Sequence, residues 1–323
     1  MRPKPALAGI LASLALAGCG AGGSSSPTSA PDGPTGITAS APHTTAPGSH
    51  ATRSPSASHS APMQATKVLV FLVENHSLGE MLAQMPWTAA LARRYGYATS
   101  YHAITHPSLP NYLAIAGGST FGVADDADPS SHPIAGHSVF GAALAAGHTA
   151  GLYAEDMPGS CVTTPAGQYA VKHNPWAYFV DERPACQQYD VPLERLAPAT
   201  RAGTLPDAGM VIANLCDIAH DCALGTADTW LRDHVGPVLA GPDFTSGRLV
   251  VVITADEDDQ SAGNSVLTVV ASKDMPAHQV VASPLTHYSL SRLYAEVLGF
   301  APLRAAATAP SLAHAFHLAV GAG

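Results

Sequence analysis

The sequence predicts an α/β fold in which helices cover both faces of a mostly parallel sheet. Two observations lead to this prediction. Two uninterrupted, β-branched runs, at 67–73 and 248–255, have the composition of central strands that are buried on both faces. Strand-like and helix-like stretches also alternate from residue 66 onward, which is typical of a three-layer α/β/α sandwich.

The remaining elements follow from the same patterns. Shorter apolar runs at 209–215 and 266–272 predict two further strands. Stretches rich in Ala and Leu at 138–147, 228–241 and 288–299 predict helices. The chain shows no internal repeat, so we expect one folded domain rather than a repeat array.

Composition limits the classes of function. Of the 323 residues, 46% are hydrophobic and 12% are charged, which is enough apolar material for a substantial core. The formal net charge of -9 argues against a nucleic-acid partner, because such proteins need a basic face.

The N-terminus has the pattern of an export signal. Arg2 and Lys4 precede an apolar run at 6–17 that is too short to span a bilayer. Residues 16–19 (LAGC) look like a bacterial lipobox, which predicts cleavage before Cys19 and attachment of a lipid to it. An ordinary secretory signal with a chance cysteine is the alternative. Both predict an exported protein, either anchored to the outer face of the cell membrane or secreted.

The chain after this signal divides into two parts. Residues 20–65 are mostly Ser, Thr, Pro, Gly and Ala without apolar periodicity, so they cannot bury enough surface to fold. We expect signal peptide 1–19, a disordered tether at 20–65 and a folded catalytic domain at 66–323.

Four cysteines remain in the mature chain, and an even number suits disulfides in an oxidising compartment. We favour the pairs Cys161–Cys186 and Cys216–Cys222, because each closes a short loop. A zinc site made from the four is the alternative. It is the weaker one, because no Cys-x-x-Cys pair is present.

Acidic side chains follow the two strongest strands. Glu74 and Asn75 come directly after the run at 67–73, and four acidic residues, 256–259, follow the run at 248–255. Carboxyl ends of neighbouring parallel strands meet at one edge of a sheet, where sites form. Such carboxylates repel one another unless a cation lies between them, and their oxygens suit a divalent ion. Two solvated loops are the alternative.

A third segment, 105–118, offers a nucleophile. Ser108 lies between two prolines, Asn111 follows, and a helix-like stretch ends in Gly117 and Gly118. A hydroxyl held beside a metal ion can lose its proton and attack phosphorus. An ordinary Pro-rich turn is the alternative for this segment on its own.

These segments resemble the phosphoesterase family of bacterial and fungal acid phosphatases and phosphatidylcholine-type phospholipases C. The resemblance implies an alkaline phosphatase-like fold and extends, in order, over most of the folded part. It is carried by VENHSLGEM, HPSLPNYLAIAGG, YAEDMPGSC, VKHNPWAYF, NLCDIAHDC, ADTWL, ITADEDD and THYSLSRLYAEVLG.

The resemblance implies a role for five of these residues. Glu74 and Asn75 match a first pair of metal ligands, and Asp256 and Glu257 match a second pair. Ser108 matches the nucleophile. The cofactor implied is a divalent metal ion, which could be Ca²⁺, Mg²⁺, Mn²⁺ or Zn²⁺.

The resemblance also implies histidines in the site. His220 matches a histidine near the substrate phosphate. A histidine shortly before the nucleophile belongs to the family's site, and His106 is our choice, with His102 as the alternative. His287 is expected to start a helix or to support the site rather than to bind the metal.

Further side chains are expected to contact the substrate, namely Asn75, Lys172 and His173. The segment VKHNPWAYF that contains two of them can equally be an aromatic packing cluster.

The resemblance implies an exported, metal-dependent hydrolase of phosphoric esters. The family's phospholipases C carry extra C-terminal domains, for which 66–323 leaves no room, so we favour an acid phosphatase acting through a phosphoserine. Its partners would be a small phosphate ester and, through the lipid anchor, the membrane. A phospholipase C or phosphodiesterase is one alternative. A non-catalytic binding lipoprotein of the cell surface is the other.

Overall fold

A computed structural model describes residues 63–321 of the chain. The expected signal peptide, Cys19 and nearly all of the expected tether lie outside the described residues. No helix in the described range is long and apolar enough to cross a membrane.

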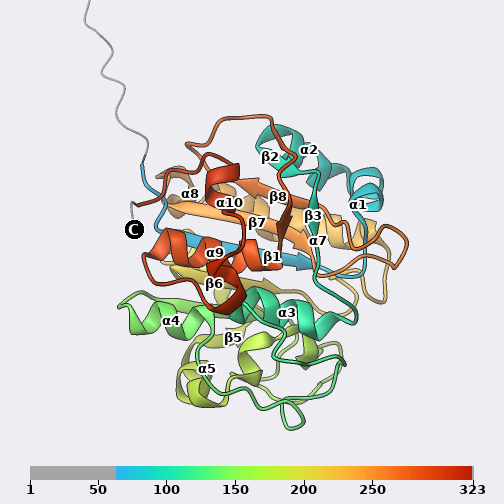
Figure 1. The fold of residues 1–323 in the computed structure, drawn as a ribbon, viewed down its shortest axis with the longest axis vertical. Coiled ribbons are helices and arrows are strands. Elements are labelled where there is room, and N and C mark those ends of the chain that lie inside the picture. Colours follow the sequence, from blue (N-terminus) through green and yellow to red (C-terminus); the bar gives the residue numbers. More distant parts are fainter. Residues whose placement is uncertain (1–62, 322–323) are drawn as a thin grey trace, which may run out of the picture. The chain divides into compact units, whose positions relative to one another are not determined.

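The core of the fold is an eight-stranded sheet (Figure 1). The strand β8 runs antiparallel to both of its neighbours, whereas every other pairing in the sheet is parallel. The strands in spatial order are β5 (Asp190–Pro192), β4 (Ala150–Ala154), β6 (Ala208–Ile212), β1 (Lys67–Val73), β7 (Leu249–Ala255), β8 (Thr268–Ala271), β2 (Gly96–Ala98) and β9 (Gln279–Val281). A separate parallel pair consists of β3 (Tyr101–His102) and β10 (Leu285–Thr286).

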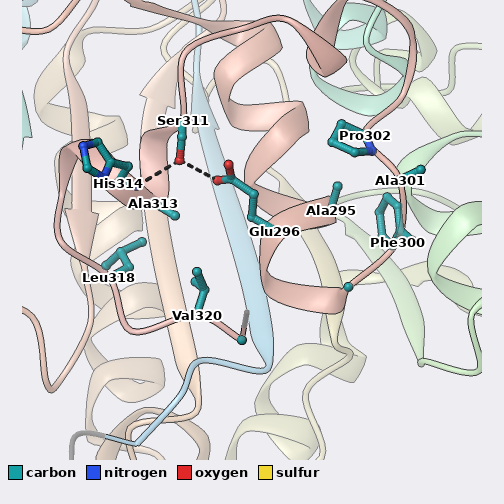
Figure 2. A pocket seen from close by; sticks show the side chains of 12 residues that line it. Ala295, Glu296, Phe300, Ala301, Pro302, Ser311, Ala313, His314, Leu318 and Val320 are labelled. Carbon is teal, nitrogen blue, oxygen red and sulfur yellow. Dashed lines mark hydrogen bonds between the residues drawn. The ribbon is translucent and has the colours of Figure 1, made fainter. Parts of the chain in front are cut away.

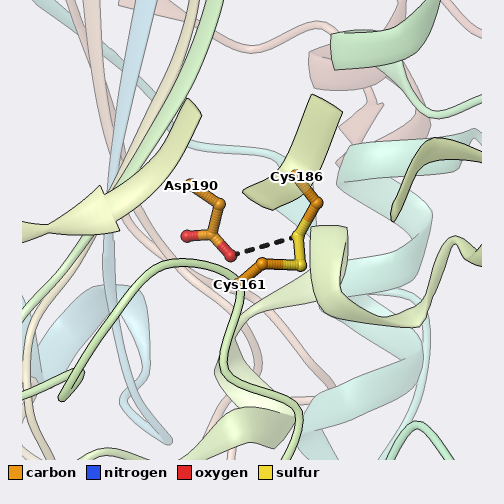
Figure 3. Close-up of side chains that lie close together, drawn as sticks. All are labelled: Cys161, Cys186 and Asp190. Atoms are coloured by element: carbon orange, nitrogen blue, oxygen red, sulfur yellow. Dashed lines mark hydrogen bonds between the residues drawn. A yellow bond between two sulfur atoms is a disulfide. The ribbon is translucent and has the colours of Figure 1, made fainter. Parts of the chain in front are cut away.

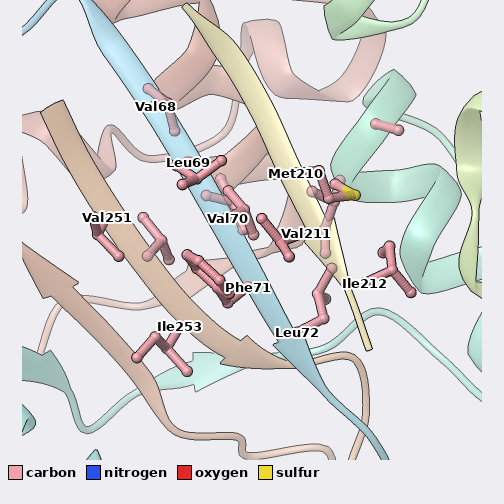
Figure 4. Close-up of a cluster of buried hydrophobic side chains, with 14 of the residues drawn as sticks. Val68, Leu69, Val70, Phe71, Leu72, Met210, Val211, Ile212, Val251 and Ile253 are labelled. Carbon is pink, nitrogen blue, oxygen red and sulfur yellow. The ribbon is translucent and has the colours of Figure 1, made fainter. Parts of the chain in front are cut away.

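The strands β1 and β7 lie side by side at the centre of the sheet (Figure 4). All seven residues of each strand are buried, as their continuous apolar composition predicts. Their register pairs Lys67 with Leu249 and Val73 with Ala255, so the two strands end at the same level. The residues that follow them, Glu74 and Asp256, therefore leave the sheet next to each other.

Helices cover both faces of the sheet. On one face α9 packs on β1, and the hydroxyl of Tyr294 in α9 donates a hydrogen bond to the carbonyl of Gly209 in β6 at 2.7 Å. On the other face Trp230 of α7 meets Phe71 of β1 edge-on, with ring centroids 6.3 Å apart. Two helical layers around one sheet are the predicted three-layer α/β fold.

The helices have the following bounds. The helix α9 (His287–Leu298) packs against α3 (Ser108–Gly117), α4 (Val139–Ala145) and α10 (Leu312–Ala315). The helix α7 (Leu224–Ala240) packs against α1 (Leu78–Gln84), α2 (Pro86–Arg94), α6 (Leu196–Ala202) and α8 (Pro242–Thr245). The helix α5 (Arg183–Tyr189) packs on β5, and short 3-10 helices are η1 (Val171–His173), η2 (Pro175–Tyr178), η3 (Val180–Glu182), η4 (Leu193–Arg195) and η5 (Arg304–Ala307).

Most of the expected elements are present. The four predicted strands are β1, β7, β6 and β8, and the three predicted helices are α4, α7 and α9. The analysis missed β4, whose sequence AGLYA contains a glycine and two alanines and therefore lacks a continuous apolar run. All five residues of β4 are nevertheless buried between β5 and β6.

Both expected disulfides are present. Cys161 pairs with Cys186 and Cys216 pairs with Cys222, with Cα atoms 5.3 and 4.8 Å apart. Since all four sulfurs are in disulfides, they are not available as zinc thiolates, which rules out the alternative of a four-cysteine zinc site. The disulfides fit an exported protein.

A buried carboxyl group lies against the first disulfide (Figure 3). Oδ2 of Asp190 lies 3.5 Å from Sγ of Cys186. This sulfur carries no proton, because it is disulfide-bonded, so it donates no hydrogen bond to Asp190. Asn174 donates a hydrogen bond to Oδ2 at 2.8 Å. Burial raises the pKa of Asp190 to about 7, although Asn174 and Arg183 act to lower it. The native state therefore retains a proton that the unfolded chain loses near pH 4.

This difference predicts a pH-dependent stability. The stabilisation from the retained proton is complete below the unfolded pKa and is lost as the pH rises through about 7. Asp190→Asn should therefore weaken the fall in the free energy of unfolding between pH 4.5 and 7.5. Urea unfolding at several pH values measures this slope, with the exposed Asp233→Asn as control. An identical slope in wild type and Asp190→Asn would contradict the assignment.

Candidate active site

A cleft of about 310 Å³ lies at the carboxyl ends of β1 and β7. Several residues that the sequence singled out come together there from distant parts of the chain. The cleft is lined by Asn75, His106, Ser108, Lys172, His220 and Glu257, among others.

A larger hollow of about 610 Å³ lies elsewhere, between α9 and α10 (Figure 2). Its walls are largely apolar, and the carboxylate of Glu296 is already paired. One oxygen of Glu296 accepts a hydrogen bond from Ser311 at 2.8 Å and the other from Arg292 at 2.6 Å. His314 also lines this hollow, but none of the acidic residues that follow β1 and β7 does, so the smaller cleft is the better candidate site.

Glu74 and Asn75 occupy the end of β1. The backbone N–H of Glu74 donates to the carbonyl of Ile218 at 2.9 Å, which ties the strand end to the loop closed by the second disulfide. Asn75 has a left-handed backbone, with φ of 53°, a conformation that asparagine tolerates. Its N–H donates to Oδ1 of Asp256 at 3.1 Å. The two acidic strand ends therefore meet, as predicted.

The Glu74 carboxylate is fully buried among cationic and imidazole groups. Nε2 of His173 lies 2.7 Å from Oε1, and Nε2 of His220 lies 3.6 Å from Oε2. Neither contact has hydrogen-bond geometry, so both oxygens remain without a hydrogen-bonded partner. Burial acts to raise the pKa of Glu74, but His173, Lys172 and His220 outweigh it and lower the pKa to about 2. The group is therefore an ionised carboxylate.

Asp256 is equally buried, with opposite consequences for its proton. Burial, reinforced by Glu74 and Glu257, raises its pKa well above the usual range. Its Oδ2 has no hydrogen-bonded partner.

His287 fixes the backbone at this point. Its Nε2 donates to the carbonyl of Asp256 at 2.6 Å, and the hydroxyl of Tyr101 lies 3.1 Å from Nδ1. Burial lowers the pKa of His287 to about 4, so the ring is neutral and accepts from Tyr101. His287 thus starts α9 and supports Asp256 from behind, as expected.

Glu257 contacts His106 and Asn111. Its Oε2 lies 3.1 Å from Nδ1 of His106 and accepts a hydrogen bond from Asn111 at 3.0 Å. Burial raises the pKa of Glu257 to about 7, although His106 acts to lower it.

The carboxylates fit a divalent cation. Three buried oxygens, two on Glu74 and one on Asp256, have no hydrogen-bonded partner, and a hard cation would satisfy them. It would also remove the repulsion between Asp256 and its neighbours. Among the described residues, only one group places three possible ligand atoms of His, Cys, Asp or Glu within 4.8 Å of one another. It consists of Cys161, Cys186 and Asp190, and its two sulfurs form a disulfide. The donor atoms of Glu74, Asp256 and Glu257 are therefore not all within this distance of one another, and binding of one ion would draw these side chains closer together.

Ser108 is the first residue of α3 and is 2% exposed. Asn111 fixes the turn that leads to it: its amide donates to the carbonyl of Thr105 at 2.8 Å, and its Oδ1 accepts from the N–H of Ile104 at 2.9 Å. The helix ends at Gly118, which has a φ of 65°. The segment is therefore a strand-to-helix turn that presents a serine to the cleft.

The sequence analysis missed Asp126. Its Oδ1 accepts the N–H of Leu109, the residue after Ser108, at 2.9 Å. Its Oδ2 accepts a hydrogen bond from the ammonium of Lys172 at 3.0 Å, and that ammonium lies 3.4 Å from Nε2 of His220. Asp126 lies in a polar loop between Gly118 and α4, where no sequence pattern distinguishes it from its acidic neighbours.

Lys172 carries the positive charge of the cleft. Burial acts to lower its pKa, but Glu74 and Asp126 outweigh burial and raise it, so the side chain is an ammonium. His173, the next residue, is 1% exposed and stacks on Tyr112 with ring centroids 5.1 Å apart. Lys172 lines the cleft whereas His173 does not, and the residues that follow them are buried as an aromatic packing cluster.

The structure separates the two candidate histidines before the nucleophile. His106 lines the cleft, and its ring lies between Glu257 and Asp258, with Nε2 3.2 Å from Oδ1 of Asp258. His102 is exposed in β3 and does not line this cleft. The geometry favours His106.

Comparisons with known proteins identify the family of the chain. The model of the "Phosphoesterase family" matches residues 67–284. The phosphatidylinositol-3-phosphatase of Mycobacterium tuberculosis is 31% identical over 76% of this chain and 81% of its own. The phosphate-repressible acid phosphatase of Penicillium chrysogenum is 29% identical over 62% of this chain, which spans about half (51%) of that relative.

The fold is also found among solved structures. A Vibrio parahaemolyticus protein of the alkaline phosphatase superfamily has a TM-score of 0.51 and 12% identity, covering 79% of this chain and 72% of its own. This likeness concerns the fold alone. The family match extends over most of the described residues and includes the cleft. The chain therefore belongs to the phosphoesterase family and is a hydrolase of phosphoric esters.

Proposed function

We propose that this chain is an exported, metal-dependent acid phosphatase that acts on phosphate monoesters through a phosphoserine at Ser108. The observation that carries the proposal is the meeting of Ser108 with the Glu74–Asp256 carboxylates and the Lys172–His220 pair around one cleft. A serine, a cation-binding acidic edge and an ammonium group are the parts that phosphoryl transfer needs.

Ser108 is the nucleophile. Its Oγ attacks phosphorus and the bond to the alcohol oxygen breaks, so the phosphoryl group passes to Ser108 and the alcohol leaves. Water then attacks the phosphoserine, which releases phosphate and restores the serine hydroxyl. A divalent ion held by Glu74, Asn75, Asp256 and Glu257 would neutralise phosphoryl charge and favour ionisation of the hydroxyl.

Lys172 and His220 bind the phosphoryl oxygens. Nδ1 of His220 lies 2.7 Å from a carboxylate oxygen of Asp221 and donates to it, which directs Nε2 into the cleft beside the ammonium of Lys172. His173 lies behind them and orders Glu74. The positive charge of Lys172 therefore stands where the transition state gathers negative charge.

His106 protonates the leaving alcohol. Its Nδ1 lies 3.1 Å from Oε2 of Glu257 and its Nε2 lies 3.2 Å from Oδ1 of Asp258, which holds the ring at the edge of the cleft. Asn75 holds the backbone between the two acidic strand ends and presents its side chain to the same cleft.

Monoesters are favoured over diesters because the relatives described above are named as phosphatases. One of these names refers to a phosphorylated lipid, so the preference for soluble monoesters rests on the lining of the cleft. No large aromatic or aliphatic side chain of the described residues lines the cleft, which leaves no apolar surface for acyl chains. The family match and the retained Ser108 with both acidic pairs argue against the other alternative, a binding lipoprotein without turnover. Cys19 would provide the lipid anchor.

Ser108→Ala should abolish turnover while the fold and metal content remain. We expect kcat for p-nitrophenyl phosphate to fall by about 10³-fold or more, since removal of a nucleophile leaves only the electrostatic part of catalysis. Steady-state kinetics with circular dichroism measures this. A near wild-type rate would show that Ser108 is not the nucleophile.

Chelation should remove turnover, and one divalent ion should restore it. Asp256→Asn should lower bound metal by about tenfold or more, because it removes a carboxylate charge from the buried set. Metal content is measured by inductively coupled plasma mass spectrometry, with Ser108→Ala as the variant that keeps the carboxylates. Unchanged occupancy in Asp256→Asn would contradict this ligand assignment.

Asp126 should position the nucleophile. Asp126→Ala removes the acceptor for the Leu109 N–H. We expect kcat to fall about 100-fold, because a small displacement of a reacting group lowers the rate by about this factor. Asp126→Asn retains an acceptor oxygen and should recover most of this loss.

The matched control for this test is Asp128→Ala, in the same loop, because its carboxylate makes no hydrogen bond or ion pair with the described residues. Separate values of kcat and KM decide the outcome. Equal kcat in Asp126→Ala and in this control would overturn the positioning role.

A further inference from the structure

A second hollow of about 480 Å³ adjoins the catalytic cleft. The two share His106, Asp258 and Gln260, and Gly263 and Asn264 complete the second hollow. His106 therefore stands at the boundary between them. A substrate whose phosphoryl group lies against Ser108 and whose ester oxygen lies near His106 has its alcohol portion directed into the second hollow.

The walls of this hollow are held in place by their own hydrogen bonds. The carboxylate of Asp258 accepts the N–H groups of Gln260 at 2.8 Å, Ala262 at 2.7 Å and Asn264 at 3.0 Å. Asn264 in turn donates to the carbonyl of Thr105 at 3.1 Å, which ties the loop after β7 to the segment before Ser108. The hollow is thus formed in advance of binding.

These bonds leave one side chain for a ligand. Oδ1 of Asn264 accepts a hydrogen bond from the N–H of Asp258, and its Nδ2 donates to Thr105. Both polar atoms of this side chain are therefore already hydrogen-bonded. The side-chain amide of Gln260 is exposed and makes no hydrogen bond with the described residues. Gln260 lines both the cleft and the hollow, so its amide can reach a hydroxyl group of a bound alcohol.

The lining also disfavours other alcohols. No Phe, Tyr, Trp or aliphatic side chain in the described range lines the second hollow, so an alkyl or acyl group gains little from burial there. The carboxylate of Asp258 in this lining, with that of Asp259 in the adjoining cleft, repels a second anionic group on the alcohol. A neutral alcohol with several hydroxyl groups is the class that remains.

We propose that the second hollow binds the alcohol portion of the substrate and that Gln260 selects hydroxyl-rich alcohols, so that monophosphates of polyols and sugars are preferred over alkyl phosphates of equal length. The inference rests on the proposed monoesterase function, because it requires a phosphoryl group at Ser108 and an ester oxygen at His106.

The test compares kcat/KM for glycerol 3-phosphate and n-propyl phosphate, which share a three-carbon chain and differ in their hydroxyl groups. The metal-loaded wild type should prefer glycerol 3-phosphate by about tenfold, the value of roughly one hydrogen bond. Gln260→Leu should reduce this ratio to about two or less. Gln188→Leu, exposed on α5, is the matched control and should keep the wild-type ratio.

The two ways of failing are distinguishable. A wild type that hydrolyses p-nitrophenyl phosphate but does not prefer glycerol 3-phosphate overturns the inference alone, as does a ratio that Gln260→Leu leaves unchanged. A wild type that hydrolyses no monoester in the presence of any divalent ion overturns the proposed function and this inference with it.

Discussion

The burial of carboxylates at the ends of two adjacent strands is the constraint on which the rest of the site depends. The register of β1 and β7 brings Glu74 and Asp256 out of the sheet together, and the N–H of Asn75 joins them at 3.1 Å. Buried charges of one sign are costly unless cations balance them. The protein supplies Lys172 and imidazole rings around Glu74, and three carboxylate oxygens still lack a hydrogen-bonded partner. A divalent ion would satisfy these oxygens, and their burial distinguishes this edge of the sheet from two solvated loops.

The surrounding loops are organised to keep these groups in place. The Cys216–Cys222 disulfide closes the loop that carries His220, and the carbonyl of Ile218 in that loop accepts the N–H of Glu74. Asn111 connects the turn before Ser108 to Glu257, and Asp126 connects the start of α3 to Lys172. The start of α3 with Ser108, the acidic edge and the ammonium group are therefore linked by side-chain hydrogen bonds that cross between distant parts of the chain. Such links restrict movement of the reacting groups, which is the main contribution a protein makes to phosphoryl transfer.

The sequence predicted those parts of the fold and site that leave a local pattern. Continuous apolar runs predicted β1 and β7, and polar residues directly after them predicted the acidic edge. Short loops predicted both cysteine pairs. In contrast, β4 was missed because its small residues gain their burial only from neighbouring strands. Asp126 was missed because its role depends on contacts with Leu109 and Lys172, and both residues are distant from it in the sequence. No local pattern connects the three residues. The choice between His102 and His106 likewise needed the direction of the chain after β3.

The central claim is that Ser108 becomes phosphorylated during turnover. The most direct measurement is acid quenching of the metal-loaded enzyme within its first turnover of a phosphate monoester, followed by mass spectrometry of the peptide that contains Ser108. The account predicts one phosphoryl group on Ser108, which disappears after the substrate is exhausted. Phosphate on a different residue, or release of phosphate with no modified peptide at any time in the first turnover, would contradict it.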